Sequence, residues 1–388
     1  MSVTLLVQTL VMLRLGLASL TERFWSSLVI VMSMACVVGV LLAMLSETDG
    51  LRRAYQTGGS PERAVVMSRD VPSEFGTSLS RNDIATLMNA PGIARGPDGR
   101  LAADAEILFW VPPAEGYTIA SPHLLGVGPA GLSLRPEFAM VSGRVFRSGQ
   151  RELIVGVRAQ RAFGLKVGDK VILPTGEWPI VGAFSAAGGI IEGQLVADAD
   201  TVMATSGISG FGSVVVRLEN VRAFETFKKW LTTNPTLAVT AERQSDYYLR
   251  TANGLSAFFT QIAYIVSAIM AAGAVFASVK IMYASVSTRT REIATLRAIG
   301  YAPLPTAIAV VLEMVVLSLT GACLGAILAW LLFNGDVKAD IRNVFDLSVS
   351  PQLFVLGLAW AMVLAIVGGL PPAIRAARLS VTDALRDT

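Results

Sequence analysis

The chain has 388 residues, a mean hydropathy of +0.57 and only 16% charged residues. A soluble domain carries about a quarter charged residues, so we expect part of this chain to lie in lipid. The net charge is only +3, and it gives no reason to expect a nucleic-acid partner. Two cysteines and one histidine cannot supply a zinc site of the usual kind, so no metal site is expected.

The first 23 residues are largely apolar, but no basic residue precedes the apolar run as it would in a secretory signal. Their Leu and Val residues fall mostly on one side of a helix. We therefore expect residues 1–23 to form an interfacial helix that contacts membrane lipids on the cytoplasmic leaflet.

Long segments with almost no charge follow at four places in the chain. A helix needs roughly 20 mainly apolar residues to cross the hydrocarbon core of a bilayer, and all four segments are long enough. Glu313 is the only charged residue between Arg297 and Asp336. We expect membrane-spanning helices over residues 24–46, 251–281 (which includes a stalk), 305–333 and 352–374.

The distribution of charge predicts the orientation of the chain. Residues 47–250 hold as many acidic as basic residues, so the net positive charge belongs to the membrane part. Short loops rich in Lys and Arg remain in the cytoplasm. We therefore expect a multi-pass protein of the inner membrane with both termini inside, including a tail over 375–388. The domain over 47–250 and a short loop over 334–351 are expected in the periplasm.

The periplasmic domain has two segments of similar pattern, and each reads as strand, helix and strand. Ser80 and Asp83 form a plausible capping box for the first helix. Asn220 is expected to cap the second helix, where Glu225 and Lys229 are spaced for an i,i+4 pair. The expected elements are 64–69, 81–90, 105–111, 213–218, 221–231 and 237–243.

The segment between these two units is rich in Gly and Pro and in short apolar runs. It predicts a β-rich insert over about 118–205. The expected fold class is therefore an α-helical membrane protein with four transmembrane helices and an α+β extracytoplasmic domain, in which two βαβ-like units flank the insert.

Three apparent motifs in this domain favour ordinary structure over chemistry. The glycines of 126–131 have the G-x-G-x-x-G spacing, but the prolines nearby exclude the helix that a dinucleotide site requires. Residues 164–171 resemble a P-loop only in outline and are better explained as a turn between a helix and a strand. His123 has no neighbouring nucleophile motif, so we expect a structural histidine and no catalytic residue.

The strip STRTREIATLRAIGY, residues 287–301, carries four ionisable side chains between two apolar segments. At 3.6 residues per turn, Ile293, Leu296 and Ile299 lie near one another, while Arg291 and Glu292 approach the next turn. The strip is either an amphipathic helix that offers charges to a partner or a basic loop that only obeys the positive-inside rule. Composition alone does not separate these two explanations.

The amino-acid sequence of the strip resembles the segment after the second membrane helix in MacB/FtsX-type ABC transporter permeases. That segment reads approximately R-x-x-E-I-x-x-L-R-A-x-G in the family. The family also has a Glu early in helix three followed by Gly-x-x-x-Gly, here Glu313, Gly321 and Gly325. Chains of the family end with a segment similar to PPAIRAARLSVTDALR, the last part of this sequence. The matching residues are Arg289, Glu292, Ile293, Leu296, Arg297, Ala298 and Gly300 in the strip, and Pro372, Ala376, Ala377, Arg378, Leu379, Ala384, Leu385 and Arg386 at the end.

This resemblance implies a permease subunit that works as a dimer, by default a homodimer, with two ABC ATPase subunits. The strip, with its flanks 282–304, would be the coupling helix in a groove of the ATPase. The residues expected to couple to the ATPase are Arg289, Arg291, Glu292, Ile293, Leu296, Arg297 and Gly300. The sequence has no Walker A motif, so we expect no bound cofactor and no enzymatic activity here, with ATP and Mg on a separate ATPase. Pro303 and Pro305 depart from the family pattern and are expected to end the coupling helix early.

The resemblance also implies mechanotransmission, in which ATPase closure moves the periplasmic domain through the polar stalks 46–56 and 242–254. The leading expectation is efflux or extrusion with a periplasmic adaptor protein. The alternatives are an FtsX-like regulator of a cell-wall hydrolase, LolC/LolE-like lipoprotein extraction, and a membrane-anchored sensor with a ligand-binding domain.

Two features of the membrane segments remain as hypotheses. Glu313 either forms an intramembrane pair with Lys280 or reaches water at the interface. Gly321 and Gly325 are expected to form a helix-packing face rather than to face lipid, although the sequence does not identify the partner helix.

Overall fold

The computed structural model describes residues 3–19, 23–71, 73–75, 78–97, 99–110, 122–173, 176–339 and 343–378. The chain divides into two compact units. The first, here called the membrane unit, comprises Met1–Thr48, Phe258–Asn334 and Ser348–Thr388. The second, the head unit, comprises Asp49–Ala257 and Gly335–Leu347. Each unit has its own hydrophobic core.

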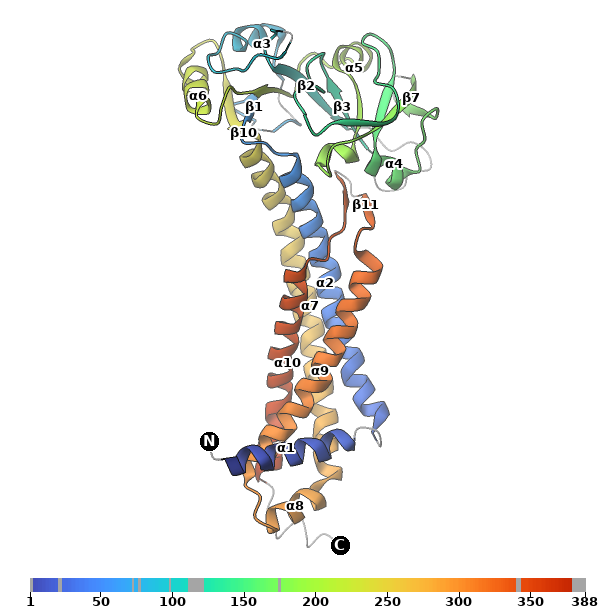
Figure 1. Ribbon diagram of the computed structural model, residues 1–388, viewed down its shortest axis with the longest axis vertical. Helices are drawn as coiled ribbons and strands as arrows, with labels where there is room; N and C mark the ends of the chain where they lie inside the picture. Colours follow the sequence, from blue (N-terminus) through green and yellow to red (C-terminus); the bar gives the residue numbers. More distant parts are fainter. Residues whose placement is uncertain are drawn as a thin grey trace. The chain divides into compact units, whose positions relative to one another are not determined.

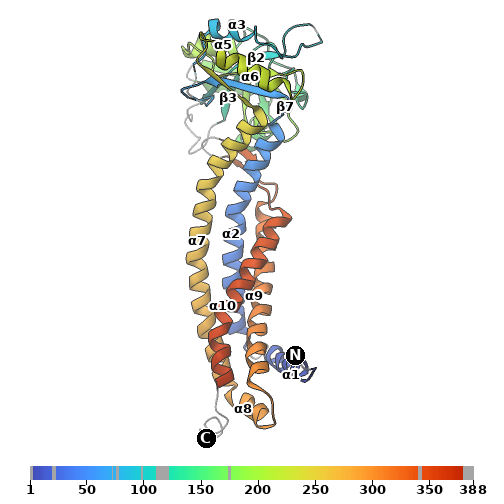
Figure 2. The same ribbon diagram turned by 90° about the vertical axis from the view of Figure 1, so that its left-hand side faces the viewer.

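Among the described residues, four helices are long and apolar enough to cross a membrane, in agreement with the expected fold class. They are α2 (Phe24–Gly58), α7 (Gln244–Thr288), α9 (Pro303–Phe333) and α10 (Pro351–Arg378). Within the membrane unit these helices run alongside one another as a bundle (Figures 1 and 2). Helices α2 and α7 continue without a break into the segments expected as stalks.

Two shorter helices complete the membrane unit. Helix α1 (Val3–Ala18) lies across α9 near one end of the bundle, and α8 (Thr290–Ala298) lies between α7 and α9 at the same end (Figure 1). Helix α9 begins with Pro303, and a proline at the first helical position loses no hydrogen bond because that N–H would have no helical partner.

The head unit contains a four-stranded antiparallel sheet in the order β10-β1-β9-β2. Its chain order is β1 (Arg63–Ser68), α3 (Arg81–Leu87), β2 (Ala103–Trp110), β9 (Ser213–Arg217), α6 (Ala223–Thr233) and β10 (Val239–Arg243). This is the split β-α-β arrangement of ferredoxin-like folds, and it confirms the two strand–helix–strand units. Strands β1 and β2 do not pair directly, since β9 lies between them.

The alternation of side chains along each strand builds two different layers. Val66, Val214 and Ala241 pack against Phe227 and Leu231 of α6. On the opposite face, Val65 and Val215 pack against Leu134 and against Tyr247 of α7. The strands are therefore buried on both faces, which explains why β1 and β9 read as unbroken apolar runs.

The insert between β2 and β9 extends the same sheet in the order β2-β3-β8-β5-β7-β4. Its pairings are mixed, with β3 parallel to β8 and β5 parallel to β7. Trp178, Phe184 and Leu153 are among its fully buried side chains. The elements are β3 (His123–Val127), β4 (Ala139–Gly143), β5 (Leu153–Gly156), α4 (Val157–Phe163), β6 (Lys170–Leu173), β7 (Gly176–Ser185), η1 (Ile190–Gly193), β8 (Leu195–Asp198) and α5 (Ala199–Ser206).

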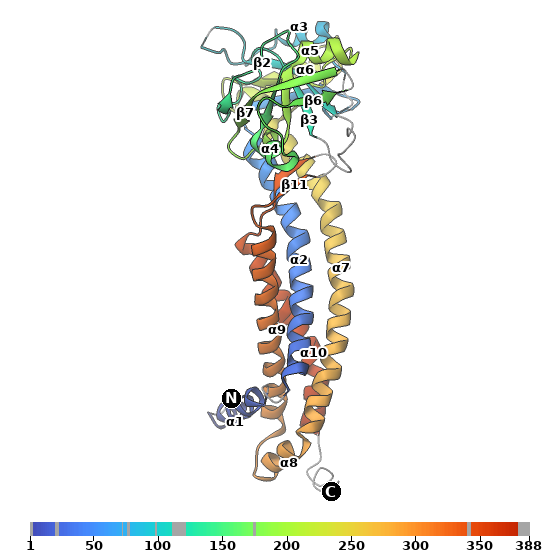
Figure 3. The same ribbon diagram turned by 90° about the vertical axis from the view of Figure 1, so that its right-hand side faces the viewer.

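The segment expected as a short loop over 334–351 contains a pair of antiparallel strands, and its residues Gly335–Leu347 belong to the head unit (Figure 3). Strands β11 (Val337–Ala339) and β12 (Val344–Asp346) form this pair, and both lie against α4. The carboxylate of Asp346 accepts a hydrogen bond from Arg158 Nε at 2.6 Å. One acidic residue of this segment therefore forms an ion pair with α4.

The local sequence signals were borne out unevenly. Ser80 and Asp83 form the expected capping box of α3. Asn220 is not the N-cap of α6: that position is Arg222, and Asn220 Oδ1 accepts from the backbone N–H groups of Arg222 and Ala223. The described ion pair of Glu225 joins it to Arg243 at 3.4 Å rather than to Lys229, because β10 lies beside α6.

Candidate functional site

The strip between α7 and α9 contains a shorter helix than the expected range 282–304. Helix α7 continues to Thr288, so residues 282–288 belong to the membrane-spanning helix. Arg289 leaves helical geometry with φ −103° and ψ 10°, and α8 then occupies Thr290–Ala298. Gly300 has φ +108°, a conformation that side-chain-bearing residues rarely adopt, and it turns the chain toward Pro303.

One side of α8 is fixed to the helical bundle. Ile293 and Ala294 are buried, and Ile293 belongs to the core that contains Val286, Val310 and Met314. Leu296 is half-buried. Helical spacing placed Ile299 near Ile293 and Leu296, but Ile299 does not lie on this side of α8, because it is 73% exposed. It follows α8 at the turn before Gly300, where helical spacing no longer decides which way a side chain faces.

The other side of α8 is open to solvent. Arg291, Glu292 and Thr295 are exposed, and Glu292 retains 66% of its side-chain accessibility. With Ala298 and Ile299 they form a small surface of mixed charge and apolar character, which we call the α8 outer face. The strip is thus an amphipathic helix and not a basic loop.

Arg289 joins the strip to the buried charge of α9. Its Nη1 lies 3.5 Å from Glu313 Oε2, and its Nε lies 3.2 Å from Glu292 Oε2. Arg289 and Glu313 retain only 13% and 6% of their side-chain accessibility. A buried carboxylate in an apolar helix requires a cation, and here that cation comes from the strip.

Lys280 is therefore not the partner of Glu313 in the described structure, contrary to expectation. The Lys280 side chain is exposed on α7, whereas Arg289 follows the end of that helix and turns back toward α9. Helix α1 also packs near Glu313. A Cβ atom at Gly16 of α1 would lie only 2.8 Å from Glu313 Oε2, so α1 lies close to this carboxylate.

Arg297 has an internal role that the sequence did not reveal. Its Nη1 donates to the carbonyl oxygen of Ala377 at 3.3 Å, near the end of α10. The final carbonyl groups of a helix lack helical partners, so a basic side chain there satisfies one of them. Arg23 does the same for the carbonyl of Ser285 in α7 at 3.0 Å. Both arginines tie connecting segments to helix ends.

Gly321 and Gly325 form a packing face against α2, the partner helix that the sequence left open. A Cβ atom at Gly321 would lie 2.3 Å from the carbonyl oxygen of Val31, and one at Gly325 would lie 2.3 Å from that of Ala35. The two backbones can approach this closely only because neither glycine carries a side chain.

The C-terminal motif is only partly visible. Pro372, Ala376, Ala377 and Arg378 lie in α10, and Pro372 and Ala376 are buried. Leu379, Ala384, Leu385 and Arg386 lie outside the described residues.

The three apparent motifs of the head unit have structural explanations. Gly128 and Ala130 donate their N–H groups to the carboxylate of Asp104, so the 126–131 segment is a turn held by a buried side chain. Gly164 and Gly168 have φ values of +66° and +99° and form the turn before β6. His123 is buried in β3 and packs against the ring of Phe75 at 5.2 Å.

The head unit contains a buried charge cluster that the sequence analysis did not predict. Arg135 donates two hydrogen bonds to Glu106, at 2.8 and 2.9 Å, and Asp104 and Glu74 lie around this pair. Burial, with the charge of Glu106 as the second cause, raises the pKa of Asp104 and of Glu74 to about 7. Alternation along β2 places Asp104 and Glu106 on one face, but only the fold covers that face.

Residues 264–381 match the family model described as FtsX-like permease C-terminal. None of the curated proteins matches the chain. The extracellular domain of the noncanonic ABC-type transporter YknZ from Gram-positive bacteria is 15% identical, with a TM-score of 0.36, and the alignment covers 46% of this chain and 99% of that one. The periplasmic region of MacB from Actinobacillus actinomycetemcomitans is also 15% identical, with a TM-score of 0.38, over 50% of this chain and 94% of that one.

The family match begins in α7 and includes α8, α9 and α10, and so it covers the whole strip and the glycine packing face. These are the elements whose sequence motifs first indicated the family. Residues 264–381 are thus similar to the C-terminal part of FtsX-like permeases, within a chain whose described residues include four helices long and apolar enough to cross a membrane.

Proposed function

We propose that this permease couples ATP hydrolysis by a separate ATPase subunit to conformational change in the head unit, and that the α8 outer face is the ATPase contact. One observation carries the proposal: Ile293 and Ala294 anchor α8 to the bundle, while Arg291 and Glu292 remain exposed on its other side. A short helix that is fixed on one side and charged on the other can transmit a push without bending.

The second half of the path is supported by the continuity of the long helices. Helix α7 begins at Gln244, directly after β10 ends at Arg243, and α2 ends at Gly58 shortly before β1 begins at Arg63. No long linker intervenes in either case, and in this proposal a displacement of the helices is passed to these strands. In this proposal the working unit is a dimer of this permease with two ATPase subunits, which bind the ATP and Mg. The head unit lies outside the cytoplasm and acts on cargo for efflux, together with an adaptor protein.

The test exchanges the two exposed charges of α8. The R291E/E292R variant preserves the net charge but reverses its arrangement toward the partner. We expect this variant to lose co-purification with the ATPase that accompanies the wild-type chain, and to lose at least ten-fold of the associated ATP hydrolysis. Both side chains are exposed, but Glu292 also contacts Arg289, so thermal unfolding in detergent must first show that the variant retains the fold of the wild type.

The matched control is K170E/E177K, which exchanges an exposed ion pair of the head unit, Nζ to Oε2 at 2.7 Å. This control should co-purify with the ATPase as the wild type does. If R291E/E292R retains full ATPase association and activity, α8 is not the contact and the proposal is wrong. Loss of ATPase association and of ATP hydrolysis in the control as well would also contradict the proposal.

A further inference from the structure

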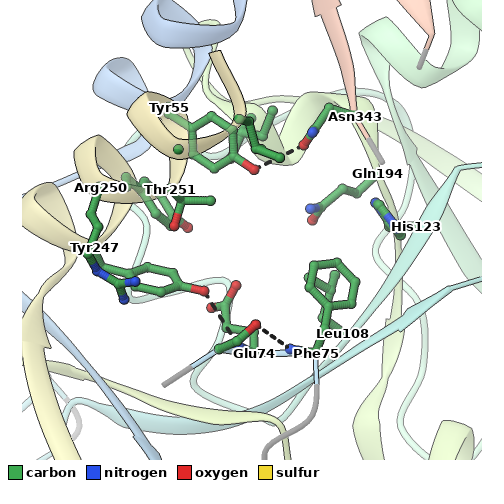
Figure 4. A pocket seen from close by; sticks show the side chains of 15 residues that line it. Tyr55, Glu74, Phe75, Leu108, His123, Gln194, Tyr247, Arg250, Thr251 and Asn343 are labelled. Carbon is green, nitrogen blue, oxygen red and sulfur yellow. Dashed lines mark hydrogen bonds between the residues drawn. The ribbon is translucent and has the colours of Figure 1, made fainter. Parts of the chain in front are cut away.

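A cavity of about 320 Å³ lies within the head unit, between the start of α7, the end of α2 and the strands. Its size is at the lower end of the range for small-molecule sites in proteins. Figure 4 shows the labelled side chains arranged around an open centre, with Tyr247 and Thr251 from α7, Tyr55 from α2 and Asn343 from the segment before β12.

Aromatic side chains form part of the cavity wall. The rings of Tyr55 and Tyr248 meet edge to face at a centroid distance of 5.5 Å, and Phe75 lies against His123 on the facing side. The hydroxyl of Tyr55 donates to Asn343 Oδ1 at 3.0 Å, which fixes one ring in place. Faces of such rings are negative, so a cage of them favours a cation.

Glu74 contributes a carboxylate to this aromatic cage. Figure 4 places it beside the hydroxyl of Tyr247, facing the open centre. Ser213 Oγ contacts its Oε1 at a long 3.5 Å. Among the described residues, no basic side chain lies within ion-pairing distance of Glu74. The nearby Arg135 forms its two charged hydrogen bonds with Glu106 instead.

Burial without a cation disfavours the charged form of Glu74, and its pKa is accordingly raised to about 7. A positive group in the cavity would restore the missing interaction. Arg250 also lines the cavity, but it does not fill that role: it is half-exposed, pairs with Glu242 at 3.1 Å and lies over the Tyr247 ring at 5.3 Å. The same pairing makes Arg250 a poor receptor for an anionic ligand.

We propose that this cavity is a binding site for a small organic cation, an amine carried on an apolar or aromatic body. The ammonium group would lie between Glu74 and the tyrosine rings, and the body would fill the side near Phe75. Gln194 and Thr251 would offer further hydrogen bonds to a polar substituent. The site is independent of the ATPase contact proposed above, since every residue that forms it belongs to the head unit.

The test uses the full-length chain in nanodiscs of zwitterionic lipid, with phenethylamine as the probe. Phenylacetate and 2-phenylethanol have the same body with a negative and a neutral head group. Calorimetric titration should show saturable binding of phenethylamine, at least ten-fold weaker binding of 2-phenylethanol and none of phenylacetate. Empty nanodiscs correct for partition into lipid.

Two variants separate the carboxylate from general damage to the fold. E74Q keeps the shape of the side chain and should weaken phenethylamine binding at least ten-fold while leaving 2-phenylethanol unchanged. E219Q removes an exposed charge elsewhere in the head unit and should bind as the wild type does. F75L, which removes one ring, should weaken binding of both ligands several-fold.

A pH series gives a second readout. The amine remains cationic from pH 8 to pH 6, whereas Glu74 takes up a proton in this range, so wild-type affinity should fall toward pH 6 and that of E74Q should not. The other charged or titratable groups around the site are Asp104, Glu106, His123, Arg135, Arg250, Tyr55, Tyr247 and Tyr248. Wild type and E74Q share all of them, so the difference isolates Glu74.

Three results would overturn the proposal. Absence of saturable phenethylamine binding would mean that the cavity holds only water. Equal affinity of wild type and E74Q would mean that the carboxylate does not recognise the cation. Tighter binding of phenylacetate would mean that the site selects the opposite charge. None of these results bears on the ATPase contact, because no ATPase is present in the titration.

Discussion

At the scale of single residues, Arg289 joins α8 to α9. It reaches Glu313 in α9 and Glu292 in α8, and a glycine of α1 lies against the same carboxylate. The family motif contains both Arg289 and Glu313, yet nothing in their spacing shows that they pair. The pair explains why a carboxylate can remain in an otherwise uncharged helix.

This ion pair gives a prediction at the residue scale. R289M should destabilise the membrane unit strongly, by roughly 3 to 5 kcal/mol, because it leaves the buried Glu313 without its cation. The double variant R289M/E313Q should be more stable than R289M alone, since the stranded charge is then removed. Thermal unfolding in detergent measures both. Additive losses in the double variant would show that the two side chains do not interact.

At the scale of elements, the packing of α9 on α2 depends on the absence of side chains at two positions. Gly321 and Gly325 lie one helical turn apart, and each faces a carbonyl oxygen of α2. The strip shows the same dependence on particular residues, since Gly300 and Pro303 end α8 and start α9. The length of α8 is therefore determined by the residues that end it as much as by the hydrophobic periodicity within it.

The prediction at this scale is that G321A lowers the apparent melting temperature in detergent by several degrees. The added Cβ would lie 2.3 Å from a backbone oxygen of α2, so the helices must separate. G273A in α7 is the matched control, because a Cβ atom there would meet nothing within 4 Å. That variant should be neutral or slightly stabilising, as alanine favours helix over glycine. Equal melting temperatures for the two variants would contradict the packing face.

At the scale of the whole molecule, the head unit buries a cluster of charged side chains beside β1 and β2. Arg135 compensates Glu106, and Arg63 pairs with Glu137 at 2.7 Å. Asp104 and Glu74 remain without a cation of their own, and their pKa values are raised to about 7. The protonation of two carboxyl groups is thereby linked to the free energy of unfolding of the unit.

The sign of this linkage gives a prediction for pH. Between about pH 4 and pH 7 the folded head unit holds protons that the unfolded chain releases, so its stability falls as pH rises through this range. We expect protection from hydrogen exchange in β1 and β9 to be greater at pH 5.5 than at pH 8, after correction for intrinsic rates. The difference should be on the order of 2 kcal/mol, because one unit of pKa shift corresponds to about 1.4 kcal/mol. E74Q should reduce it and E219Q should not; an unchanged difference in E74Q would exclude Glu74 as a source.

Sequence periodicity and composition predicted much of the architecture. The four apolar helices, the two strand–helix–strand units and the capping box of Ser80 all rest on interactions between near neighbours in the chain or on the length needed to cross a bilayer. The predictions that were wrong involve packing between distant segments. Glu225 pairs with Arg243 because β10 lies beside α6, and Glu313 pairs with Arg289 because α8 turns back toward α9.

By itself, then, the sequence determined that the chain crosses the membrane, which family it resembles and where a charged helix interrupts the apolar segments, because hydropathy and short motifs are local properties. The tertiary structure decided which face of α8 is exposed, which helix Gly321 and Gly325 approach, and that Glu74 faces a cavity without a cation. Those features depend on which distant residues become neighbours, and the hydrophobic pattern of a single segment does not specify its neighbours.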